Sequence, residues 1–242
     1  MRKEIRKTVS KFFWPTIFAI AMGFLEATVV VYLRELYYPN GFTFPLITFP
    51  EKIFYIEIIR EFATIVMLVS VGVISGNNLL QRFAYFLYCF AVWDIFYYIA
   101  LKIFLNWPES LFTWDVLFLI PVAWVGPVIA PIINSLTMII LAIMIIYFQE
   151  NNIPLKTNRL EWVLIILGVL IIFCTYIWDY LSIVIKEGLL SNSLTKNQKL
   201  LAAITNYQPT YFNWYTLISG ELLIFYALFR IQYYSRLFKE DN

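Results

Sequence analysis

The stretch LEWVLIILGVLIIFCTYIWDYLSIVI, residues 160–185, decides the fold class of this chain. A helix needs about 20 consecutive apolar residues to cross the hydrocarbon core of a bilayer, and this stretch is longer than that. An isolated strand cannot satisfy its backbone hydrogen bonds in lipid, whereas a helix satisfies them within itself. The stretch therefore predicts a helix that spans a membrane.

Five further apolar stretches resemble the first in length and character. We expect six transmembrane helices, at about residues 12–33, 54–76, 83–105, 119–148, 160–185 and 212–234. The composition agrees, because 61% of the residues are hydrophobic and 14% are charged, against about 45–50% and about 25% in soluble domains. The sequence predicts an all-α, polytopic membrane helix bundle, with residues 1–242 as a single transmembrane domain.

Basic residues predict the orientation of the bundle, since Lys and Arg are enriched in cytoplasmic loops. On one side lie the N-terminal arm, the second and fourth connections, and the C-terminal end, with Arg2, Lys3, Arg6, Lys7, Lys11, Arg82, Lys156, Arg159, Arg236 and Lys239. We therefore expect both termini to be cytoplasmic. The first apolar stretch is too long for the core of a cleaved signal peptide, so it is interpreted as an uncleaved signal-anchor helix.

The fourth stretch is irregular. Residues 115–148 are too many for one perpendicular helix at about 1.5 Å per residue, and they include Pro121, Gly126, Pro127 and Pro131. Because proline removes a backbone donor and kinks a helix, we expect a short outer-interface segment from Thr113 to Ile120, followed by a tilted, kinked helix. The alternative is a broken helix that lines a polar cavity.

Leaving aside Glu161 at the very start of its stretch, six carboxylates fall inside the predicted spans, together with one clearly intramembrane base, Arg60. The acids are Glu26, Glu57, Glu61, Asp94, Asp179 and Glu221. A central charge costs roughly 2.5–3.5 kcal/mol on insertion scales, so such residues are functional candidates by default. Counting residues from the span ends places all six between the outer surface and the middle of the membrane.

Two interpretations of these charges stay open. The acids can pair across helices and specify the bundle, or they can line an outward-opening acidic vestibule that binds a cation, a proton or a polar solute. The candidate ligand- or ion-binding residues are Glu26, Glu57, Arg60, Glu61, Asp94 and Glu221.

Local spacing suggests partners for some of the charges. Glu57, Arg60 and Glu61 share one helix face, and an arginine there can pair bidentately with one carboxylate. Tyr97 and Tyr98 are the expected donors to Asp94. Arg34 follows Glu26 by eight residues, at the interface, where its side chain can snorkel.

Small residues recur every four positions in the first two spans, as Ala19, Gly23 and Ala27 and as Gly72 and Gly76. This spacing lets helix backbones approach closely. We expect these faces to pack within the bundle rather than to form a dimer.

Several chemistries have no support in the sequence. Histidine is absent, which removes the usual haem, zinc and general-base side chain. Cys89 and Cys174 lie in apolar stretches, and no phosphate-binding glycine loop occurs. The sequence therefore predicts no catalytic residues, no metal site, no cofactor and no nucleic-acid partner.

Several segments resemble a family of bacterial multi-pass membrane proteins that has no assigned activity. They are GFLEATVVVYLRELYYP (23–39), EIIREFATIVML (57–68), WDIFYY (93–98), WPES (107–110) and WDVLFLIP (114–121). The resemblance covers roughly residues 12–135. It implies a bacterial cytoplasmic (inner) membrane location and carries over no site residue.

Three classes of function remain open from the sequence. The first is a small transporter or an ion- or proton-handling protein that uses an outward-facing acidic intramembrane site. The second is an accessory or structural subunit of a larger membrane complex, for example a respiratory one. The third, a carboxylate-dependent lipid-active enzyme, is disfavoured. The partners expected are the lipid bilayer and either further copies of the chain or such a complex.

Overall fold

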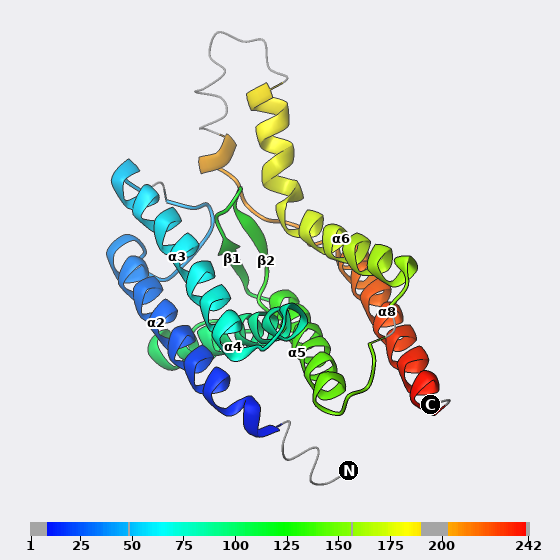
Figure 1. Cartoon of the computed structure of the whole chain (residues 1–242). Helices are drawn as coiled ribbons and strands as arrows, with labels where there is room; N and C mark the ends of the chain where they lie inside the picture. The colour runs from blue at the N-terminus through cyan, green and yellow to red at the C-terminus, as the bar shows by residue number, and fades with distance from the viewer. Residues whose placement is uncertain (1–8, 48, 156, 190–202, 241–242) are drawn as a thin grey trace.

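A computed structural model describes residues 9–47, 49–155, 157–189 and 203–240 (Figure 1). Six of its helices are long and apolar enough to cross a membrane. They are α2 (Phe13–Tyr37), α3 (Glu51–Ser75), α4 (Leu79–Leu105), α5 (Ile129–Glu150), α6 (Arg159–Ile183) and α8 (Trp214–Glu240), and the π-helix η1 (Val184–Leu189) extends α6. The protein is therefore a multi-pass integral membrane protein, as predicted.

Helices α4 and α6 begin where the sequence supplies caps. Asn78 starts α4 by accepting a hydrogen bond from the backbone N–H of Gln81 (3.0 Å), and Asn106, with a φ of 52°, ends it in the left-handed conformation. Asn158 and Glu161 form a capping box at the start of α6, which satisfies two backbone donors. These caps fix where α4 begins and ends and where α6 begins.

Both ends of the bundle lie on one side, because α2 begins and α8 ends there (Figure 1). Their cytoplasmic location stays a prediction. Five of the basic residues that support it, Arg2, Lys3, Arg6, Lys7 and Lys156, lie outside the described residues.

Close helix packing is achieved through small residues, as predicted. Helix α4 packs against α2, α3 and α5, and α6 packs against α8. A Cβ atom on Gly23 would lie 2.8 Å from the carbonyl oxygen of Trp93, and one on Gly72 would lie 2.8 Å from that of Arg82. These glycines therefore allow α2 and α3 to approach α4 closely. Gly168 and Gly220 bring α6 and α8 together in the same way, a pairing that was not predicted from the sequence.

The fourth segment differs from the expectation. Its helix begins at Ile129, and the residues before it form an antiparallel hairpin of β1 (Trp114–Phe118) and β2 (Trp124–Pro127). Residues before a proline avoid the helical conformation, which affects Ile120 and Gly126. Of the prolines expected to kink the helix, only Pro131 lies in α5, in the first turn, where its missing N–H is not needed.

The hairpin lies between α3 and α6 (Figure 1). Non-helical backbone in a membrane is tolerated only where protein buries it or where it lines a cavity. The ends of this hairpin are held by backbone hydrogen bonds, from Val128 N to Thr113 O (3.0 Å) and from Ile129 N to Leu111 O (2.8 Å). The backbone N–H of Leu119, just beyond β1, donates to the side chain of Glu61. The hairpin thus forms one wall of the candidate site.

Candidate functional site

A cavity of about 430 Å³ opens between α2, α3, α4, the end of α6 with the start of η1, the hairpin, and residues 38–47 and 49 of the connection from α2 to α3. Because that connection follows the far end of α2, the cavity lies on the side of the bundle opposite the termini. Its volume is within the range of small-molecule sites, about 300–1,000 Å³.

The charged residues of the lining are mostly acidic. Five carboxylates and two guanidinium groups face the cavity, namely Glu26, Glu57, Glu61, Asp94, Asp115, Arg34 and Arg60. Aromatic side chains make up much of the remaining wall, among them Trp93, Tyr97 and Phe54. Five of the predicted site residues are therefore brought together in one place.

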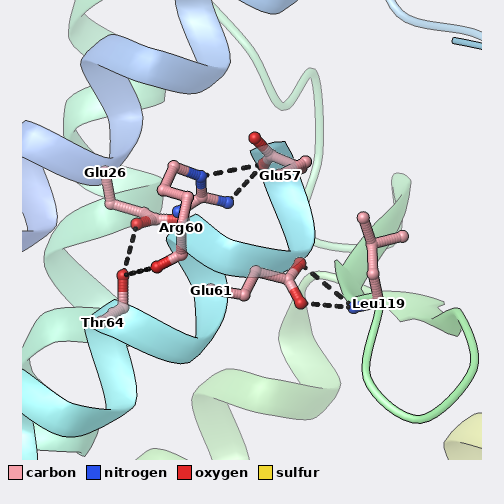
Figure 2. A network of polar contacts seen from close by, with 6 residues as sticks. All are labelled: Glu26, Glu57, Arg60, Glu61, Thr64 and Leu119. Atoms are coloured by element: carbon pink, nitrogen blue, oxygen red, sulfur yellow. Dashed lines mark hydrogen bonds and ion pairs between the residues drawn. The ribbon is translucent and has the colours of Figure 1, made fainter. Parts of the chain in front are cut away.

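Arg60 joins two carboxylates from two helices, as Figure 2 shows. Its Nε donates to Glu57 Oε1 (3.0 Å), its Nη2 donates to the same oxygen, and its Nη1 donates to Glu26 Oε1. Thr64 donates from Oγ1 to the carbonyl oxygen of Arg60 (3.0 Å) and to Glu26 Oε2 (3.5 Å). The predicted pairing of Arg60 with a carboxylate on its own helix face is confirmed, and Glu26 extends it to α2.

The side chain of Glu61 faces the hairpin and does not pair with Arg60. Both of its carboxylate oxygens accept from the backbone N–H of Leu119, at 3.1 and 3.0 Å (Figure 2). The side chain is buried. Glu61 thus has a neutral donor and no direct ion pair.

Asp94 also has a neutral donor. Ser135 Oγ on α5 donates to Asp94 Oδ2 at 2.8 Å. The expected donors, the Tyr97 and Tyr98 hydroxyls, do not fill that role. Asp94 therefore links the cavity wall to α5.

Arg34 and Asp115 form an ion pair that was not predicted from the sequence. Arg34 is only 7% exposed, so the expected snorkelling to the interface is wrong. Its Nη2 donates to Asp115 Oδ1 at 3.0 Å, and its guanidinium carbon lies 3.7 Å from the ring centre of Trp107 and 4.5 Å from that of Phe42. Burial raises the pKa of the Asp115 carboxyl to about 6, although the Arg34 charge acts in the opposite direction.

No local signal could have revealed this pair. The two residues are 81 positions apart, and Asp115 belongs to a segment that the sequence placed at the outer interface, where a charge needs no partner. The hairpin brings Asp115 to the cavity.

Glu221 and Asp179 lie elsewhere. Glu221 Oε2 accepts from Thr137 Oγ1 at 2.7 Å, between α5 and α8, and Glu221 is not part of the cavity lining. Asp179 is exposed and accepts from the Tyr207 hydroxyl at 3.0 Å. The structure therefore does not bring Glu221 together with the other predicted site residues, because depth along a helix does not say which neighbour its side chain faces.

Within the described residues, no three acidic or cysteine side chains are grouped so that they could hold a metal ion. The chain matches no family model, no curated protein and no solved structure. The chain is a multi-pass integral membrane protein with an acidic, aromatic cavity open on the side opposite its termini.

Proposed function

We propose that the cavity binds a small cationic solute and that the protein is a transporter or ion-handling protein of the bacterial inner membrane. The observation that supports this is the excess of acidic groups, with five carboxylates against two guanidinium groups around one cavity. A cleft lined by one sign of charge in low-dielectric surroundings concentrates ions of the other sign.

The ion pairs around the cavity leave two of its acids without an arginine partner. Arg60 contacts two carboxylates and Arg34 contacts one. Glu61 and Asp94 are left with neutral donors, an amide and a hydroxyl. A cation that enters the cavity therefore meets acidic groups whose charge no arginine neutralises directly.

The aromatic wall favours an organic cation over a bare metal ion. Trp93, Tyr97 and Phe54 are among the rings that line the cavity, and the faces of aromatic rings attract ammonium groups. A volume of about 430 Å³ also suits a molecule with several heavy atoms. A protonated amine has the chemistry that this wall recognises.

Binding can be tested with the protein in lipid nanodiscs. A panel of alkylammonium chlorides should raise its thermal unfolding midpoint, whereas neutral alcohols of matched size should not. The shift should be lost in Glu61→Gln and Asp94→Asn. It should persist in Glu51→Gln, which removes an exposed carboxylate at the start of α3. Equal stabilisation by the alcohols, or an undiminished shift in both cavity variants, would falsify the proposal.

Transport is a separate question from binding. Proteoliposomes that contain the wild-type protein should take up a labelled alkylammonium ion that stabilises it, and those with Glu61→Gln should not. Binding without uptake would make the protein a receptor for the solute and not its carrier.

One observation favours a second candidate, an accessory subunit of a larger membrane complex. Arg60 ties α2 to α3 through Glu26 and Glu57, as expected for acids that specify the arrangement of helices. The mass of the protein extracted from its native membrane in nanodiscs decides between the two. A defined complex supports the accessory role, and a lone monomer or homodimer counts against it.

A further inference from the structure

A second polar cluster lies where α5 meets its neighbours. Asn134, Ser135 and Thr137 of α5 each donate to a side chain of a different helix: Tyr176 of α6 (2.6 Å), Asp94 of α4 (2.8 Å) and Glu221 of α8 (2.7 Å). Helix α5 therefore joins the helices around it by hydrogen bonds in an otherwise apolar region.

Two acceptor oxygens in this cluster have no donor. Glu221 Oε1 and Asn134 Oδ1 are fully buried and make no hydrogen bond. An unsatisfied buried acceptor costs about 1–3 kcal/mol, and a charged one costs more. Asn134 lies one helical turn before Thr137, which holds the other oxygen of Glu221, so the two residues share one face of α5. Both oxygens therefore lie along one face of α5: Asn134 belongs to this face, and Glu221 of α8 packs against it.

The charge of Glu221 is also uncompensated. Among the described residues, no arginine or lysine pairs with it, and the Thr137 hydroxyl is its hydrogen-bond partner. Glu221 is 6% exposed. A buried carboxylate is costly unless a proton or a counter-charge neutralises it, and one carboxylate balances one monovalent cation. A divalent ion would need more acidic oxygens.

We propose that Glu221, Asn134 and Thr137 form a second site, which binds a monovalent alkali-metal cation such as sodium. Hard cations prefer oxygen ligands, and a carboxylate, an amide carbonyl and a hydroxyl supply them here. The unpaired oxygens Glu221 Oε1 and Asn134 Oδ1 would contact the ion directly. The proposal for this site holds whether or not the cavity binds a solute.

The position of the site links it to the cavity all the same. Ser135 stands between Asn134 and Thr137 in the sequence and donates to Asp94, which lines the cavity. A cation that draws Asn134 and Thr137 together acts on the same turn of α5 that holds Asp94. Sodium binding and solute binding are therefore coupled through this turn.

The direct test is the binding of radioactive sodium to the full-length protein in nanodiscs, with competition by unlabelled NaCl. The wild-type protein should bind sodium saturably. Glu221→Gln should weaken binding by more than about tenfold, since it removes the charge, and Thr137→Val, which removes the hydroxyl without changing the shape, should weaken it less. Glu61→Gln should leave sodium binding intact, which separates this site from the cavity.

Thr28→Val is the matched control. Thr28 is a half-buried threonine on α2 whose hydroxyl donates to the Phe24 carbonyl (2.8 Å), and its loss should leave sodium binding unchanged. If Glu221→Gln does not fold, Thr137→Val carries the test. The proposal is overturned if the wild-type protein binds no sodium, or if Glu221→Gln or, in its place, Thr137→Val binds it as tightly. Stability that responds to pH but not to sodium also overturns it and identifies a proton as the counter-charge.

Discussion

Arg34 and Arg60 line the same cavity but are neutralised in different ways. Arg34 pairs with one carboxylate, Asp115, and lies against the rings of Trp107 and Phe42. Arg60 pairs with two carboxylates, Glu26 and Glu57, and its side chain is more exposed, at 19% against 8%. The first group is balanced in charge and fastens the hairpin to α2, whereas the second keeps a net negative charge at the cavity. The contrast separates a structural ion pair from one that leaves charge for a ligand.

The largest effect should follow Arg60→Met. The buried Glu57 and the partly buried Glu26 then lose their shared partner, and breaking a buried pair costs about 3–5 kcal/mol. The free energy of unfolding in mixed micelles, followed by circular dichroism, measures this loss. Adding Glu26→Gln and Glu57→Gln should restore most of the stability. A cost below about 1 kcal/mol for Arg60→Met would show that the two acids do not depend on this arginine.

Arg34→Met should lower the free energy of unfolding by less, about 3 kcal/mol, because it leaves only one carboxylate unpaired. The double variant Arg34→Met with Asp115→Leu should unfold close to the wild-type midpoint, since an apolar pair of similar volume replaces the ion pair. The same unfolding measurement applies. If Arg34→Met costs more than Arg60→Met, the ring contacts contribute more than the second carboxylate, and the contrast is reversed.

The pH dependence of stability tests whether Asp115 is fully ionised beside Arg34. Its pKa in the folded protein is raised to about 6 from an ordinary value of 3.8. The folded state then holds the proton more tightly, so this contribution to stability is present below pH 3.8 and is lost as pH rises through about 6. Relative to Asp115→Asn, the wild-type protein should lose about 2 kcal/mol across this range. If the difference in unfolding free energy between the wild-type protein and Asp115→Asn does not change with pH, Arg34 keeps the Asp115 carboxylate ionised over the whole range.

Replacing each arginine by lysine should have the smallest effect, a small difference between the two variants in the free energy of unfolding. Arg34→Lys loses the planar group that stacks on Trp107 and Phe42, whereas Arg60→Lys keeps a charge between two acids. Arg34→Lys should therefore cost about 1 kcal/mol more than Arg60→Lys. Equal losses of unfolding free energy in the two lysine variants would mean that the rings of Trp107 and Phe42 add no stabilisation specific to the guanidinium group of Arg34.

The sequence predicted those features that depend on one helix at a time. Length and hydropathy gave the six spans, and the spacing of Glu57 and Arg60 gave their ion pair. The close approach at Gly23 followed from the small residues on its helix face. Each of these follows from helical periodicity, which needs no knowledge of neighbouring elements.

The features that the sequence did not predict depend on contacts between distant segments. Glu26 and Glu221 were both placed in the outer half of the membrane, yet one faces the cavity and the other faces α5. Depth follows from counting residues, but the direction of a side chain depends on how the helices are arranged around one another. The hairpin was missed for a related reason, since its strands are stable only against the surrounding helices. The orientation of the bundle, its membrane and the family resemblance stay predictions.

The contact between Glu61 and the Leu119 amide makes a helix carboxylate the acceptor for a loop backbone. A cation that draws this carboxylate into the cavity would leave a buried N–H without an acceptor, at a cost of about 1–3 kcal/mol, unless the loop follows. The loop also holds the indole of Trp124, which donates to the Ile120 carbonyl at 2.9 Å. In a variant that keeps Trp124 and replaces the other seven tryptophans, we therefore expect the emission to change when Glu61 turns from the loop to a bound solute.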